Sequence, residues 1–215
     1  MKKNLFHIFL LAFILTQFVI SARADVKAEK IVKQVLTKYE AAKTFQADFE
    51  QTYYWVLTDN KSEQYGTIWL EGKTKFKIQT ENQLIVSDGK TVWTYSKTTN
   101  QVLIDDVQKT DDITLPGDIM LTFLDKYDPV YIGEELTNGI KCHRLELTSK
   151  TDDQFIQKII LWIGNKDLEV KKIQQIDLNK NKNTYVLKSI QFDVLFPKDF
   201  FQYSPPDSVE IIDMR

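Results

Sequence analysis

The sequence holds a single cysteine, Cys142, among its 215 residues. A disulfide framework is therefore excluded, and the domain must be held together by its hydrophobic core. A lone thiol of this kind is more often a buried spectator than a nucleophile. Glycine and proline are also scarce, with seven and five residues, and no linker, repeat or low-complexity stretch divides the chain. We therefore expect one domain over residues 25–215.

An excess of positive charge is missing too. Lysine and arginine number 28 against 30 aspartates and glutamates, which gives a formal charge of −2. Three of the basic residues precede residue 25, so the remainder is more acidic still. A nucleic-acid partner needs a basic surface, and this composition argues against one.

Only one long apolar run is present, from Leu5 to Ile20. Two lysines precede the run, and Ala22-Arg23-Ala24 follows it, so residues 1–24 are interpreted as a signal peptide cleaved after Ala24. The alternative, a membrane anchor, fits less well because the run is short for a span. No cysteine stands at the cleavage site, so the exported chain is not expected to be a lipoprotein itself.

The motifs of common catalytic and metal sites are missing as well. His143 is the only histidine after residue 24, and it adjoins Cys142 in an expected strand. Neighbours in a strand point to opposite faces, so these two cannot form a nucleophile–base pair. Acidic doublets such as Asp105-Asp106 are more typical of solvated turns. We therefore expect no catalysis, no metal and no cofactor.

The pattern that is present begins with a helix and continues as strands. Apolar residues at three-to-four spacing predict an amphipathic helix over 26–43. Phe45 to Trp55 then alternates with a period of two, and Asp88-Gly89 is a strong hairpin signal. Strands are expected at 45–55, 65–70, 75–80, 84–87, 91–95, 101–107, 130–133, 141–148, 155–163, 170–177, 185–196 and 209–212.

The middle of the chain interrupts this rhythm. Turn residues at 115–118 precede apolar residues at helical spacing, which predict a short helix from Ile119 to Tyr127 that ends before Asp128-Pro129. The whole pattern favours one antiparallel meander, curled or closed, with two helices.

Aromatic residues are abundant, with 13 Phe, 9 Tyr and 4 Trp. A curled sheet lined by alternate aromatic positions can hold a lipid. Three alternatives remain open at this point: a carrier or sensor of some other lipid, a structural or interaction protein whose aromatics fill its core, and an enzyme.

Four segments resemble the LolA family of periplasmic outer-membrane lipoprotein carriers. They are similar to that family's first strand, second strand, main hairpin and C-terminal ending, in that order. The segments are Phe45-Gln46-Ala47-Asp48-Phe49-Glu50-Gln51, Gly66-Thr67-Ile68-Trp69-Leu70, Val86-Ser87-Asp88-Gly89-Lys90-Thr91-Val92-Trp93-Thr94-Tyr95 and Phe201-Gln202-Tyr203-Ser204-Pro205-Pro206-Asp207-Ser208-Val209.

The resemblance implies a mainly β fold: an incomplete, strongly curved antiparallel β-barrel with a helical lid over an apolar cavity. It implies a periplasmic monomer that takes acylated lipoproteins from an inner-membrane ABC-type release complex. The lipoprotein would be delivered to an outer-membrane lipoprotein acceptor, with no cofactor. Acyl chains gain about 0.8 kcal/mol per buried CH₂, so they need such a shield in water.

Alternation and the resemblance together nominate nine residues to line the cavity, the last three from the lid. They are Phe45, Phe49, Trp69, Phe76, Trp93, Tyr95, Met120, Phe123 and Leu124. The family's lid-latching arginine is absent from Gly72-Lys73-Thr74-Lys75-Phe76, and Lys73 is the nearest substitute. A lysine is a point charge without the planar fork of arginine.

Overall fold

The computed structural model describes residues 26–107 and 126–215, as a helix over residues 26–41 and twelve strands. The strands are β1 (Thr44–Trp55), β2 (Asn60–Glu71), β3 (Lys75–Thr80), β4 (Gln83–Asp88), β5 (Thr91–Ser96), β6 (Gln101–Asp106), β7 (Tyr127–Thr137), β8 (Ile140–Ser149), β9 (Ile156–Gly164), β10 (Val170–Asp177), β11 (Lys182–Phe192) and β12 (Glu210–Asp213). None of the helices in these ranges has the length and apolar character needed to cross a membrane.

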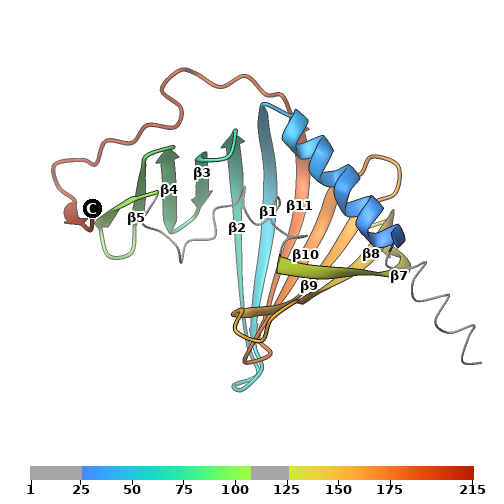
Figure 1. Cartoon of the computed structure of the whole chain (residues 1–215). Coiled ribbons are helices and arrows are strands. Elements are labelled where there is room, and N and C mark those ends of the chain that lie inside the picture. Colours follow the sequence, from blue (N-terminus) through green and yellow to red (C-terminus); the bar gives the residue numbers. More distant parts are fainter. Residues whose placement is uncertain (1–25, 108–125) are drawn as a thin grey trace, which may run out of the picture.

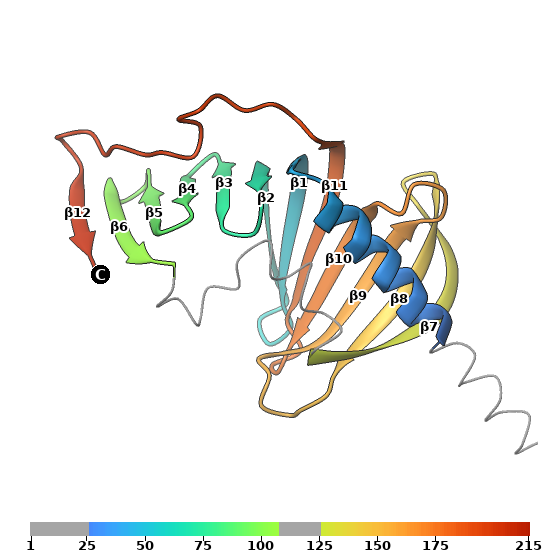
Figure 2. The same cartoon turned by 45° about the horizontal axis from the view of Figure 1, so that its top comes forward.

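All twelve strands form one curved sheet in the order β12-β6-β5-β4-β3-β2-β1-β11-β10-β9-β8-β7 (Figures 1 and 2). The two edge strands, β12 and β7, do not pair with each other, so the sheet stays open. The mainly β, incompletely closed architecture is as predicted. It is not a simple meander, however, because β11 returns to pair with β1 and β12 runs parallel to β6.

The Asp88-Gly89 signal does form the β4–β5 hairpin. The Asp88 carboxylate accepts hydrogen bonds from the backbone N–H groups of Lys90 and Thr91, at 2.8 and 2.9 Å. Gly89 has a φ of 96°, a conformation that side chains disfavour. This turn fixes the register of β4 against β5, in which Val86 opposes Trp93.

The helix covers one face of the sheet, which we call the inner face. Its buried residues, including Ile31, Val32 and Val35, pack on β8, β9 and β10 in one hydrophobic cluster. At the end of the helix, the Tyr39 ring lies 5.5 Å from that of Phe45 and 5.1 Å from that of Phe192 (centroid distances). The helix is thereby tied to the junction of β1 and β11, at the middle of the sheet (Figure 2).

On the opposite, outer face, side chains of the C-terminal segment, residues 193–209, pack against the sheet; the segment runs from β11 to β12 past the ends of the strands between them (Figure 1). The Phe200 ring packs on Trp69 at 5.7 Å, and Tyr203 stacks on Tyr95 at 6.3 Å. Val209 is buried against Val102 in β6. The first half of the sheet therefore has apolar contacts on both faces.

Two predicted boundaries are corrected. Tyr127, expected to end the second helix, begins β7 instead, and residues 119–125 of that expected helix lie outside the described residues. Pro129 lies within β7, where it is tolerated because β7 is an edge strand. The strand predicted to reach Phe196 ends at Phe192, after which the chain leaves the sheet as the C-terminal segment.

Candidate ligand-binding site

A pocket of about 330 Å³ lies on the inner face, where the two halves of the sheet meet. Its walls come from β1, β2, β3 and β4 on one side and from β10 and β11 on the other. The lining residues are Phe45, Phe49, Gln51, Gln64, Ile68, Leu70, Ile78, Thr80, Gln83, Ile85, Ile173, Gln175, Tyr185 and Leu187.

Strand alternation explains why these residues share one face. Phe45, Phe49 and Gln51 stand at odd positions of β1, and their even neighbours face outward. The same face continues across neighbouring strands, because residues directly opposite each other in paired strands point to the same side of the sheet. Phe49 opposes Leu187 in β11, and Gln51 opposes Tyr185.

A glycine shapes the wall beside Phe49. Gly66 in β2 opposes Phe49, and the Phe49 ring lies over it. A Cβ atom added at Gly66 would stand 2.6 Å from Phe49 Cζ and 2.5 Å from the carbonyl oxygen of Gln79. Gly66 is thus required by the close approach of the aromatic ring.

The lining contains no charged residue among the described positions. Most of the wall is aliphatic and aromatic, and the polar groups are amides, a threonine and the Tyr185 hydroxyl. Burial raises the pKa of Tyr185, although hydrogen bonds from Asn183 and Gln51 act in the opposite direction. The tyrosine is therefore neutral at physiological pH, and the pocket presents apolar and neutral polar surface only.

Three of the nominated residues lie on the inner face. Phe45 and Phe49 line the pocket. Phe76 does not: it is only 2% exposed and packs with Phe45, Leu70 and Val92 inside a hydrophobic cluster. It is therefore an ordinary core residue, and the expectation that it lines the cavity is corrected.

Three other nominees lie on the outer face, which corrects the expectation that they line the cavity. Trp69, Trp93 and Tyr95 occupy positions of opposite parity to Leu70 and Val92, which face inward. Their contacts are with the C-terminal segment and β6 instead. In β2 and β5 the residues on the inner face are smaller aliphatic ones. The positions of the aromatic residues therefore did not identify the inner face of these strands.

Three lining candidates and the latch candidate remain. Met120, Phe123 and Leu124 lie outside the described residues. Lys73 is exposed in the β2–β3 turn, and no described residue accepts a hydrogen bond or ion pair from it. The neighbouring lysine, Lys75, pairs with Glu71 at 2.6 Å. The role of Lys73 as a latch stays a prediction.

Sequence reasoning missed most of the aliphatic lining, notably Ile68, Ile78, Ile85, Ile173 and Leu187. Strand pairing and alternation identify them: starting from Phe49, the residue opposite it in the next strand and every second residue from there lie on the same face. The partner of Phe49 in β2 is Gly66, and two residues further on stands Ile68. Residue type alone, which favoured the tryptophans, was the weaker guide.

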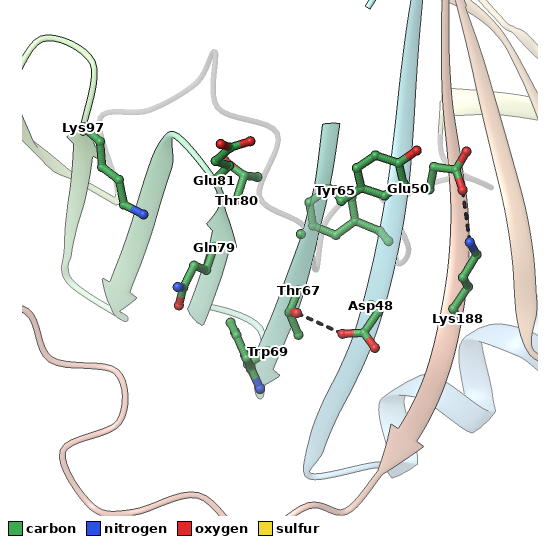
Figure 3. Close-up of a pocket in the computed structure, with 12 residues that line it drawn as sticks. Asp48, Glu50, Tyr65, Thr67, Trp69, Gln79, Thr80, Glu81, Lys97 and Lys188 are labelled. Atoms are coloured by element: carbon green, nitrogen blue, oxygen red, sulfur yellow. Dashed lines mark hydrogen bonds and ion pairs between the residues drawn. The ribbon is translucent and has the colours of Figure 1, made fainter. Parts of the chain in front are cut away.

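A second hollow lies on the outer face of β1–β3 (Figure 3). It is larger, at about 600 Å³, but it is an open groove, and five of its twelve lining residues are charged: Asp48, Glu50, Glu81, Lys97 and Lys188. Asp48 accepts a hydrogen bond from the Thr67 hydroxyl at 2.9 Å, and Lys188 pairs with Glu50 at 3.0 Å (Figure 3). Such a surface is well solvated and offers little to a hydrocarbon chain, so the smaller inner pocket is the better candidate.

Cys142 and His143 lie on opposite faces of β8, as predicted. Cys142 is completely buried with Ile160 and Trp162 on the outer face, and burial raises the pKa of its thiol. The His143 ring lies beside that of Tyr131, with centroids 5.8 Å apart. The two side chains therefore cannot act together on one substrate.

The model of the family described as outer membrane lipoprotein carrier protein LolA matches residues 40–204. This chain belongs to the LolA family. An outer-membrane lipoprotein carrier protein of Glaesserella parasuis is 29% identical over 199 residues, which cover 90% of the chain and 89% of that relative. An uncharacterized protein of Methanocaldococcus jannaschii is 28% identical over 191 residues, which cover 87% of the chain but only 54% of the relative.

Solved structures share the fold of this LolA-family chain at low sequence identity. An uncharacterized conserved protein from Thermus thermophilus has a TM-score of 0.58 at 15% identity, covering 87% of this chain and 99% of its own. LprF from Mycobacterium bovis has a TM-score of 0.50 at 10% identity, with coverages of 85% and 97%. At such identities the likeness shows the fold alone.

Proposed function

We propose that this LolA-family protein carries acylated lipoproteins through the periplasm and performs no chemical step. In this proposal the inner-face pocket holds the acyl chains of a lipoprotein released from the inner membrane. The observation that carries the proposal is the uncharged lining of that pocket, whose walls come from both halves of an open sheet. Relatives named outer-membrane lipoprotein carrier protein support the choice of cargo.

The free energy of burying an acyl chain in this pocket suits a carrier that must later release its cargo. Each buried CH₂ contributes about 0.8 kcal/mol, so burying several methylene groups of an acyl chain is worth several kcal/mol. The described pocket, at about 330 Å³, is near the lower end of the usual range for ligand sites, about 300–1,000 Å³. Partial shelter of this kind keeps acyl chains out of water while allowing their later release.

The proposal includes two partners and a route. An inner-membrane ABC-type complex hands over the lipoprotein, and an outer-membrane acceptor receives it. Export through a signal peptide cleaved after Ala24 brings the protein to the periplasm, and N-terminal sequencing of the exported protein tests that step. A chain that retains Met1 would refute it.

Blocking the pocket tests the central part of the proposal. Leu187 lines the pocket, and its neighbour Val186 faces outward from the same strand, at a similar degree of burial. Leu187→Trp should fill the cavity and reduce binding of a fluorescent acyl probe by at least about tenfold, a loss of about 1.4 kcal/mol. Val186→Trp is the matched control and should bind the probe as the wild type does. Equal binding by both variants would refute the pocket as the site.

A second candidate is a carrier of some other lipid, favoured by the exposed Lys73 in place of an arginine. Lipoprotein release from inner-membrane vesicles distinguishes the two. Release that depends on the protein and is lost in Leu187→Trp supports the lipoprotein carrier. Acyl binding without release supports the other lipid, and absence of any acyl binding supports a purely structural protein.

A further inference from the structure

Four of the polar side chains that line the pocket, those of Gln51, Gln64, Gln175 and Tyr185, join Asn183 in one connected band on the inner face. The Gln51 side-chain amide donates to Asn183 Oδ1 at 2.8 Å and to the Tyr185 hydroxyl oxygen at 3.0 Å. Asn183 in turn donates to Tyr185 at 3.0 Å and to Gln175 Oε1 at 3.5 Å, and Gln64 donates to Gln51. We call these four amides and the Tyr185 hydroxyl the amide band.

The amide band adjoins the apolar part of the pocket along the strand direction. In β1, Gln51 follows Phe49 on the same face, and in β10, Gln175 follows Ile173. The inner face therefore changes from hydrocarbon to amide within about 7 Å, the span of two strand residues. A ligand lying along β1 would meet an apolar wall first and hydrogen-bonding groups next.

Two donor groups of the band donate to no described residue and are available to a ligand. The Tyr185 hydroxyl accepts from two amides, and no described residue accepts its own hydrogen. The Gln175 amide nitrogen likewise donates to no described residue, while its oxygen accepts from Asn183. Both residues line the pocket, and burying such groups without a partner carries a free-energy cost.

We propose that the amide band is a neutral subsite for the ester or amide carbonyls that join acyl chains to their carrier molecule. This rests on the proposed function of the pocket and specifies its ligand: an acyl chain with an uncharged polar linkage. A carboxylate or phosphate in the same place would be desolvated without a cationic partner, because no described lining residue is charged. The subsite therefore discriminates against free fatty acids and buried phosphate groups.

Ligands that share one acyl chain but differ in the head test the subsite. The probes are a fatty-acid methyl ester, the corresponding free fatty acid at about pH 8, where its carboxyl group is ionised, and a hydrocarbon of equal length, each displacing a fluorescent acyl probe. The wild type should bind the ester at least about tenfold more tightly than the anion. Gln175→Leu and Tyr185→Phe should each weaken ester binding about threefold to tenfold, as expected for one lost hydrogen bond, and should not weaken hydrocarbon binding.

Gln174→Leu is the matched control, because Gln174 faces outward and donates to the Thr184 hydroxyl at 3.0 Å. It should leave the affinities of all three ligands unchanged. Equal affinity of the wild type for ester and anion would overturn the neutral subsite while leaving an acyl pocket intact. Ester binding unaffected by both band variants would overturn it in the same way. Failure of the wild type to bind any of the three ligands would overturn the proposed function itself.

Discussion

Replacing Phe76 with alanine should cost as much stability as a substitution in a closed core. The ring is 2% exposed and packs against Phe45, Leu70 and Val92, without lining the pocket. Loss of the buried ring removes about 1.5–3 kcal/mol of transfer free energy, and the cavity left behind adds to this. We therefore expect Phe76→Ala to lower the free energy of unfolding by about 3–5 kcal/mol.

Urea unfolding, followed by circular dichroism with the m-value compared between variants, measures the effect. Phe155→Ala is the control, since Phe155 is 61% exposed and its truncation should change stability by no more than about 0.5 kcal/mol. Folded Phe76→Ala protein should retain acyl binding. A loss below about 2 kcal/mol, or an acyl affinity reduced in proportion to that of Leu187→Trp, would show that Phe76 borders the ligand and not the core.

Three further predictions concern the wall, the pH response and the tryptophans. Gly66→Ala should destabilise the fold by about 1–3 kcal/mol in urea, because its Cβ would strike the Phe49 ring; an unchanged midpoint would contradict the packing described. Burial and the charge of Lys27 lower the pKa of His143. The unfolded chain therefore binds a proton that the folded chain resists, and stability should fall as pH drops through about 6.5, by more than in His143→Gln; parallel pH profiles would refute this. A saturated acyl ligand should leave the tryptophan emission maximum unchanged, because none of the four tryptophans lines the described pocket; a clear shift would place one of them at the ligand.

Much of the sheet was predictable because local signals coincide with it. Period-two alternation located most of the strands, and the β3 and β10 boundaries agree with the expected ranges to the residue. The return of β11 to β1 and the parallel pairing of β12 with β6 were not predictable, since both join segments more than a hundred residues apart. The local sequence of β11 or of β12 does not indicate the strand with which it pairs.

The site was harder to predict than the fold. Aromatic residues mark the inner face in β1 but the outer face in β2 and β5, where Trp69 and Trp93 pack beneath the C-terminal segment or beside β6. In a strand with apolar residues on both faces, alternation does not show which face points to the core, because either face can be buried. The second apolar layer, supplied by residues 193–209, removed the contrast on which the prediction of Trp69 and Trp93 depended.

Photocrosslinking in living cells tests most directly whether the inner face holds the cargo. A photoreactive phenylalanine analogue replaces Ile85, which lines the pocket, or Leu84, which faces outward from the same strand. We expect adducts with acylated lipoproteins from position 85, lost when lipoprotein acylation is blocked, and few from position 84. Equal adducts from both positions, or adducts that persist without acylation, would contradict the claim that this pocket shelters acyl chains.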